Sequence, residues 1–200
     1  MHRSPRLSDL QPIRLQPVAT ADETRLFRGL LQHYHYLGYR GPVGENLRYL
    51  IHDRQGRLLG CLLYGAAAWR MAARDRFIGW EASVRQQNLA LIANNMRFLI
   101  LPWVRVAHLA SHLLALSRRQ ICADWQAKYG HPIVLLETCV EQGRFTGTCY
   151  RADNWVHVGD TRGRGRNHNS GDPTVAIKSI WLHPLDPRFR HWLTEGARGQ

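Results

Sequence analysis

Residues 97–140 read RFLILPWVRVAHLASHLLALSRRQICADWQAKYGHPIVLLETCV, and their pattern decides the fold. The apolar run before Pro102 predicts a strand over 95–100. From Ala107 to Lys128 the apolar residues recur at helical spacing, which predicts a long helix ending at Gly130. The segment 133–140 is nearly all apolar, which is typical of a strand covered on both faces. Strand, helix and strand in this order indicate an α/β protein.

The chain on either side of this stretch adds further elements. Thr20 or Asp22 can cap a helix over 21–35, and two strands flank the turn Asp53-Arg54-Gln55-Gly56. These two strands are expected at 47–52 and 57–66. After them we expect a strand or irregular segment at 76–80, a helix at 81–91, a short helix or loop at 142–151, and strands at 154–159 and 175–182. We therefore predict one α/β domain over 19–193, with a mixed central sheet covered by helices. Residues 1–18 would form a flexible arm or an entering edge strand, and 194–200 a tail.

The balance of charge is strongly positive. The chain has 27 Lys and Arg against 15 Asp and Glu, a formal net charge of +12, and only Lys128 and Lys178 are lysines. The planar fork of arginine binds phosphate in a bidentate manner. A genome rich in GC explains arginine in place of lysine, but it does not explain the excess over acids. The composition thus favours a nucleic-acid partner, DNA or RNA, and we take DNA as the leading expectation.

Other features argue against membrane, secreted and metal-binding classes. The N-terminal residues MHRSPRLSDLQP lack the apolar core of a secretory signal, and the longest apolar run is too short to span a bilayer. The four cysteines form no CxxC pair, so we expect reduced thiols and a cytoplasmic protein. His33 and His35 do not share a helical face, and no third ligand is evident, so we predict no metal site.

The densest cluster of positive charge lies between residues 144 and 166. It includes the loop TRGRGRNHNSGD (161–172), whose alternating glycine and arginine suit contacts to the phosphate backbone. The alternative is a solvated surface loop. The predicted nucleic-acid-binding residues are Arg144, Arg151, Arg162, Arg164, Arg166 and Lys178.

Three residues in or near the same segment could carry chemistry. Glu137 lies near the end of a buried strand, where ligand sites gather in α/β sheets, and could act as a base. Equally, it could be a structural carboxylate that pairs with Arg144 or caps a helix. Cys149 would be a nucleophile if Arg144 or Arg151 lowered its pKa. Tyr150 could stack on a base or belong to the core. An enzyme that modifies or cleaves nucleic acid at a Glu137/Cys149/Tyr150 cleft is thus the alternative function, and whether chemistry occurs stays open.

Longer motifs carry a family resemblance. The order of strands and helices, together with YRADNWVHVG at 150–159, resembles the GNAT acetyltransferase superfamily. More specifically, the chain over 25–193 resembles the DruA family of the Druantia anti-phage system, on five stretches: HYHYLGYRGPVGENLRYLI, FIGW, NNMRFLILPWVRVAHLASHLL, DWQAKYGHPIVLLETCVEQGRFTGTCYRADNWVHVGDTRGRGR and KSIWLHPL. The resemblance implies a GNAT-like fold and a role in phage defence or beside mobile elements, with other defence-system or transposon proteins as partners.

One departure from the GNAT pattern concerns the cofactor. GNAT enzymes bind the acetyl-CoA pyrophosphate with a turn of the form Gln/Arg-x-x-Gly-x-Gly/Ala. The matching run here is Arg105 to Ala110, and His108 stands at the glycine that lets the backbone approach phosphate. We therefore expect no ordinary acetyl transfer and predict no cofactor.

Overall fold

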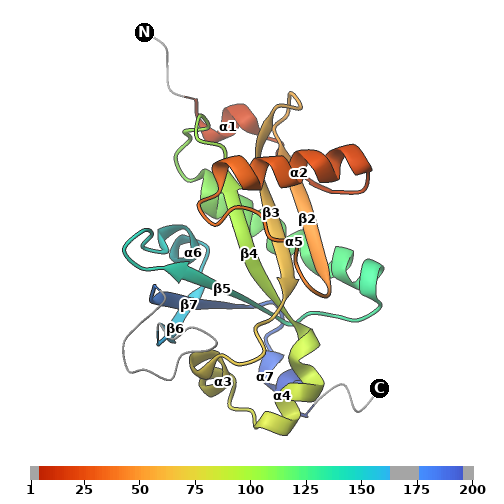
Figure 1. Ribbon diagram of the computed structural model, residues 1–200, viewed down its shortest axis with the longest axis vertical. Coiled ribbons are helices and arrows are strands. Elements are labelled where there is room, and N and C mark those ends of the chain that lie inside the picture. The colour runs from red at the N-terminus through yellow and green to blue at the C-terminus, as the bar shows by residue number, and fades with distance from the viewer. Residues whose placement is uncertain (1–4, 163–175, 196–200) are drawn as a thin grey trace. The chain divides into compact units, whose positions relative to one another are not determined.

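The computed structural model describes residues 5–162 and 176–195, and Figure 1 shows the course of the chain. The chain divides into two compact units, each built from two separate stretches of sequence. Unit 1 comprises residues 1–66 and 95–129, and unit 2 comprises 67–94 and 130–200. The strand order is β1-β2-β3-β4-β5-β7-β6, and β4 contributes residues to both units.

The sheet of unit 1 is built around a β-hairpin. Its strands are β1 (Arg14–Pro17), β2 (Asn46–His52), β3 (Leu58–Ala66) and the later part of β4 (Ile92–Ile100). β2 is antiparallel both to β1 and to β3. The hairpin turn forms because the buried Asp53 carboxylate accepts hydrogen bonds from the backbone N–H groups of Gln55 and Arg57, each at 2.9 Å.

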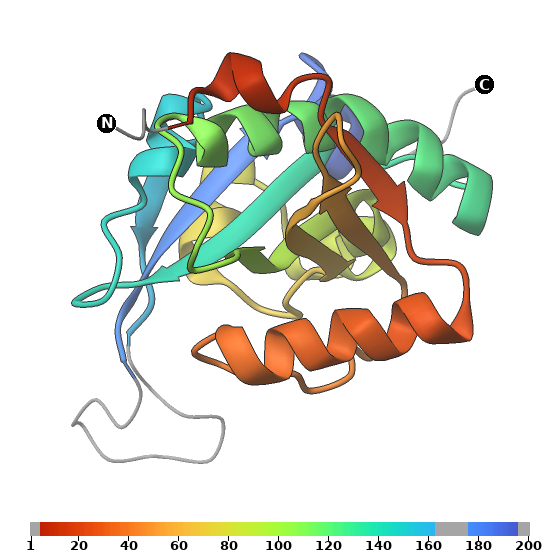
Figure 2. The same ribbon diagram turned by 90° about the horizontal axis from the view of Figure 1, so that it is seen from above.

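Helices cover both faces of this sheet, as Figure 2 shows. They are α1 (Leu7–Leu10), α2 (Ala21–Tyr34) and α5 (Leu109–Tyr129). Thr20 and Glu23 form a capping box at the start of α2, whose Phe27 and Leu31 are fully buried against the sheet. On the opposite face, the hydroxyl of Tyr49 in β2 donates to Asp124 of α5 at 2.8 Å.

The sheet of unit 2 is mixed. Its strands are residues 92–94 of β4, β5 (Leu135–Glu141), β6 (Val156–Asp160) and β7 (Lys178–Pro184). The start of β4 is parallel to β5, with Asn94 opposite Glu137. β7 lies between β5 and β6 and is antiparallel to both, so that Trp181 has Thr138 on one side and His157 on the other.

The helices of unit 2 also lie on two faces of its sheet. One face carries α3 (Ala72–Ile78) and α7 (Phe189–Glu195), with α4 (Ala82–Asn88) and the 3-10 turn Leu89–Leu91 beside them. Side chains of these helices form an apolar core with Leu135, Ile180 and Leu182. The other face carries α6 (Thr148–Ala152), where Tyr150 packs edge-on against Trp155 at 5.1 Å between ring centroids.

The structure confirms the predicted fold class and most predicted elements, and it corrects one. Residues 76–80, expected as a strand or irregular segment, belong largely to α3, which ends at Gly79 with left-handed backbone (φ +84°). This helix depends on tertiary contacts, because its Arg74 is fully buried. Residues 14–17 form the edge strand β1. Within the described part of the chain, no helix is both long enough and apolar enough to cross a membrane.

Candidate functional site

Glu137 lies in the middle of β5 and is fully buried. Its Oε2 accepts a hydrogen bond from Nη1 of Arg74 at 2.8 Å, and its Oε1 accepts one from the backbone N–H of Ala68 at 2.9 Å. The same Arg74 nitrogen donates to the carbonyl of Ala68 at 2.7 Å. Burial raises the pKa of Glu137, and the Arg74 guanidinium opposes that rise. Glu137 thus holds the segment before α3 against β5.

The partner of Glu137 differs from the one expected from sequence. Arg144, the expected partner, lies instead 3.6 Å from Glu141, measured from Nε to Oε1. The sequence does not single out Arg74, because it is 63 residues away from Glu137 in the chain. The available signal is an arginine inside the short segment 71–78, which also holds buried methionine, alanine and isoleucine side chains.

The three residues considered for catalysis do not come together. Side chains alternate between faces along a strand, so Glu137 shares its face of the sheet with Leu182, its partner across β7. That face is covered by α3 and α7. Thr138 and its partner Trp181 point to the other face, where Trp181 meets Arg151 of α6. Cys149 and Tyr150 belong to α6, so the sheet separates them from Glu137.

Cys149 lacks the environment of an activated nucleophile. Burial raises the pKa of its thiol to about 11, whereas the nucleophile hypothesis requires a lowered pKa. Tyr150 is buried, with its ring against Trp155, so it belongs to the core of unit 2. These two residues therefore support α6 rather than form an open cleft with Glu137.

Three of the six predicted cationic residues, Arg144, Arg162 and Lys178, lie at one end of the unit 2 sheet. Thr161 and Lys178 are joined by two hydrogen bonds: the Thr161 N–H donates to the Lys178 carbonyl at 2.8 Å, and the Lys178 N–H donates to Thr161 Oγ1 at 2.9 Å. Lys178 also lies opposite Glu141 in β5, and the turn that carries Arg144 starts directly after Glu141. Arg162, which follows Thr161, is exposed.

We call Arg144, Arg162 and Lys178 the basic edge. It lies where β5 and β6 end and β7 begins. Arg151 lies on α6, with its guanidinium carbon 5.8 Å from the centroid of the Trp181 ring. Arg164 and Arg166 lie outside the described residues.

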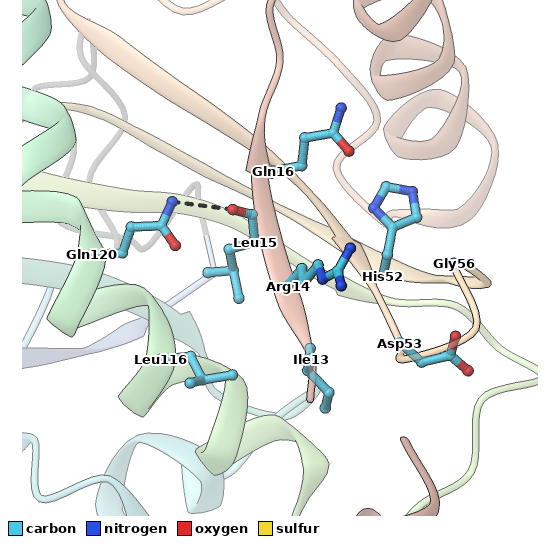
Figure 3. Close-up of a pocket in the computed structure, with 9 residues that line it drawn as sticks. All are labelled: Ile13, Arg14, Leu15, Gln16, His52, Asp53, Gly56, Leu116 and Gln120. Atoms are coloured by element: carbon cyan, nitrogen blue, oxygen red, sulfur yellow. Dashed lines mark hydrogen bonds between the residues drawn. The ribbon is translucent and has the colours of Figure 1, made fainter. Parts of the chain in front are cut away.

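Unit 1 contains a pocket that the sequence does not predict. It has a volume of about 700 Å³ and lies among β1, the β2–β3 turn and α5; Figure 3 shows its lining, namely Ile13, Arg14, Leu15, Gln16, His52, Asp53, Gly56, Leu116 and Gln120. Its polar groups are largely used within the protein. Asp53 holds the turn and binds Nε of Arg57 at 2.7 Å, and Gln120 Nε2 donates to the Leu15 carbonyl at 3.1 Å. Asp53 and Gln120 are therefore engaged in holding the fold of unit 1.

The turn before α5 bears on the use of acetyl-CoA. His108 is exposed, and its backbone is left-handed, with φ +62°. Glycine adopts this conformation without strain and leaves the backbone open to a ligand. At His108 the turn instead carries a Cβ and an imidazole, so it does not fit a pyrophosphate in the way a glycine-containing turn does. No chemical step is assigned to acetyl-CoA.

No metal centre is evident among residues 5–162 and 176–195, which hold no group of three or more His, Cys, Asp or Glu side chains that could share an ion. His33 is instead placed with Nδ1 2.8 Å from the carbonyl of Gly29, one turn earlier in α2.

Comparison with solved structures identifies the fold. A chimera of the spermidine N-acetyltransferase SpeG from Vibrio cholerae and hSSAT superposes with a TM-score of 0.56 at 10% identity, covering 86% of this chain and 95% of that one. A nourseothricin acetyltransferase superposes with a TM-score of 0.51 at 10% identity, covering 88% and 100%. At such low identity the likeness establishes a GNAT acetyltransferase-like fold, as predicted, and nothing about activity.

Comparison with known sequences is more specific. Druantia protein DruA from Escherichia coli (strain UMEA 4076-1) is 27% identical over an alignment of 144 residues that covers 68% of this chain and 35% of that protein. The chain thus spans about a third of the length of this curated relative. A family model described as Druantia protein DruA matches residues 5–191, nearly the whole chain. The chain belongs to the Druantia protein DruA family.

Proposed function

We propose that this protein is a nucleic-acid-binding component of phage defence or mobile-element biology, and that it contacts DNA through the arginine-rich face of unit 2. The observation that carries the proposal is the basic edge, where Arg144, Arg162 and Lys178 are brought to one end of the sheet from three separate parts of the chain. Family membership supports the defence role, because the curated relative is a Druantia protein.

The electrostatics of the basic edge favour a polyanion. The Arg144–Glu141 pair is 3.6 Å long and its arginine is exposed, and pairs of this kind contribute at most about 1 kcal/mol. Asp160, another acid that the structure describes at this end, lies with Oδ1 3.0 Å from Nε2 of His157. A phosphate oxygen can therefore replace Glu141 as the partner of Arg144 at little cost in free energy. The net charge of +12 attracts DNA at longer range.

Duplex binding of this kind would be largely independent of sequence. Contacts from arginine and lysine to phosphates set affinity and position, whereas base readout requires side chains in a groove. Arg151 adds a guanidinium on α6. Arg162 follows β6, and Arg164 and Arg166 come after it in the sequence.

The test measures DNA affinity against salt for the triple variant Arg144→Ala/Arg162→Ala/Lys178→Ala. We expect weaker binding and a plot of log affinity against log salt that is shallower by about 0.9 for each phosphate that the variant no longer neutralises. Arg162→Ala/Arg164→Ala/Arg166→Ala should act in the same direction. Arg188→Ala is the matched control, because Arg188 is exposed and follows the opposite end of β7. Equal affinity and slope for both triple variants and the wild type would refute the proposal.

A further inference from the structure

Unit 1 carries large aromatic side chains that the fold leaves exposed. Trp103, in the loop after β4, is 62% exposed, and Tyr34, at the end of α2, is 45% exposed. Their rings meet edge to face, with centroids 5.3 Å apart and planes at 86°. Figures 1 and 2 show the end of α2 and the loop after β4 on the same side of unit 1. Folding thus holds two aromatic rings together without removing them from water, although burying them would be favourable.

Another exposed aromatic side chain, Tyr36, follows two residues after Tyr34. The rings of His35 and Tyr36 stack, with centroids 4.9 Å apart and planes at 27°. His35 Nδ1 accepts a hydrogen bond from the Leu37 N–H at 3.2 Å. Burial, and then the nearby Arg97, lower the pKa of His35 to about 4, so its ring is neutral at pH 7. We call Tyr34, Tyr36 and Trp103 the aromatic patch.

The surroundings of the aromatic patch are positively charged. The segments that carry the patch, residues 24–44 and 95–108, contain no Asp or Glu, and they hold Arg25, Arg28, Arg40, Arg97 and Arg105. Arg25 is paired with Asp22, but Arg28, Arg40 and Arg105 are exposed. Arg97 is fixed beside the patch by a hydrogen bond from Nε to the carbonyl of Gly38 at 3.3 Å. Apolar ring faces therefore occur together with cations, in stretches of chain that carry no acid.

We propose that the aromatic patch binds the unpaired bases of single-stranded nucleic acid, with Arg28, Arg40 and Arg105 holding the adjacent phosphates. Every base has a flat face that stacks on an aromatic ring, and its backbone carries the negative charge that the arginines require. A duplex fits less well because its base faces are covered by the neighbouring pairs. An acidic protein surface would supply negative charge without flat apolar faces, and a neutral surface would supply apolar groups without the charge. A single strand supplies both, at a regular spacing.

This site is separate from the basic edge. It belongs to unit 1, contacts bases as well as phosphates, and prefers a single strand. The basic edge belongs to unit 2 and contacts phosphates alone. Either site can bind without the other, so each has its own test.

The experiment measures fluorescence anisotropy of labelled oligonucleotides with the full chain. The probes are an oligothymidine of about 20 nucleotides, an abasic strand of equal length and charge, and a duplex. Trp103→Ala and Tyr34→Ala should each weaken oligothymidine binding roughly 10-fold, as expected when one base no longer stacks. Binding to the abasic strand should stay unchanged, and Trp103→Phe should restore most of the affinity. Trp69→Ala is the matched control, because Trp69 is a 54% exposed tryptophan of unit 2.

Several results would overturn the inference. They are equal wild-type affinity for oligothymidine and the abasic strand, no effect of Trp103→Ala, or an equal effect of Trp69→Ala. Circular dichroism and thermal unfolding of each variant establish that it is folded. If the triple variant of the basic edge binds more weakly but the aromatic variants do not, this inference fails and the proposed function stands. If only the aromatic variants lose affinity, the proposed function fails and the inference about the aromatic patch stands.

Discussion

Nη1 of Arg74 lies 2.8 Å from Oε2 of Glu137, and neither side chain is exposed to solvent. The pair joins α3 to the middle of β5. The remaining guanidinium nitrogens of Arg74 donate to Asp75, which in turn pairs with Arg85 at 3.1 Å. All these charges lie within unit 2, and they explain how the arginine side chain of a short helix can be fully buried.

Removing one partner of this pair should destabilise the protein strongly. Glu137→Leu leaves the charge of Arg74 buried without its main partner, which should lower the free energy of unfolding by about 3–5 kcal/mol. Urea unfolding followed by circular dichroism measures the change. The double variant Arg74→Met/Glu137→Leu removes both charges and should be less destabilised than the sum of the single variants. If the loss in free energy of unfolding for the double variant equals the sum of the losses for Arg74→Met and Glu137→Leu, the two side chains do not stabilise each other.

Gly147 should not tolerate a side chain. Its φ is +71°, and a Cβ there would lie 2.7 Å from Cζ2 of the buried Trp181. Gly147→Ala therefore combines backbone strain with overpacking, and we expect a loss of about 2–4 kcal/mol in thermal or urea unfolding.

Gly143 provides the matched control for that substitution. Its φ is +74°, but a Cβ there would have no atom within 4 Å, so Gly143→Ala tests backbone strain alone. We expect a loss of about 1 kcal/mol for this variant. Equal losses for the two alanine variants would show that the contact with Trp181 costs nothing.

His35 should make stability depend on pH in a defined window. Its pKa in the folded protein is about 4, lowered first by burial and then by Arg97, against 6.5 for an ordinary histidine. The unfolded chain therefore binds more protons between these values, and stability falls as the pH drops from 6.5 towards 4. His35→Gln should reduce this loss. An NMR titration of the His35 ring should give a midpoint near 4, and a midpoint near 6.5 would exclude the burial on which the prediction rests.

The cysteine thiols should react slowly in the native protein. Burial raises the pKa of Cys139 and Cys149 to about 11 and that of Cys61 to about 12. At neutral pH the thiolate fraction of Cys149 should be roughly 100-fold below that of an ordinary cysteine. Iodoacetamide labelling followed by peptide mass spectrometry tests this, with labelling in urea as the reference. Rapid native labelling of Cys149 would revive the nucleophile hypothesis.

The sequence predicts the elements whose pattern is local. Thr20 marks the start of α2, Asp53 marks the hairpin turn, and the apolar run at β5 marks a buried strand, because each signal lies within a few residues of the structure it specifies. The sequence does not reveal α3, since the stability of this helix comes from Arg74 meeting Glu137, a contact between distant parts of the chain.

The candidate site follows the same rule. The concentration of arginine near Arg144 is visible in the sequence, but the contact of Lys178 with Thr161, the residue before Arg162, depends on how β6 and β7 pair. The face of the sheet to which Glu137 points depends on the register of β5 against β7, where Glu137 lies opposite Leu182. No single segment of the sequence encodes that register. Tyr34 and Trp103 likewise come from elements almost 70 residues apart, so their contact is visible only in the folded chain.

The division of the chain between its units has a consequence for synthesis on the ribosome. Unit 1 takes its second stretch from residues 95–129, so it lacks α5 until Tyr129 has been made. By then residues 67–94, which belong to unit 2, have already been translated and must wait for β5 and β7. No single cut in the chain separates one complete unit from the other. A minimal version of unit 1 would therefore require a spliced gene that joins Ala66 to Asn95 through a new linker, rather than a simple truncation.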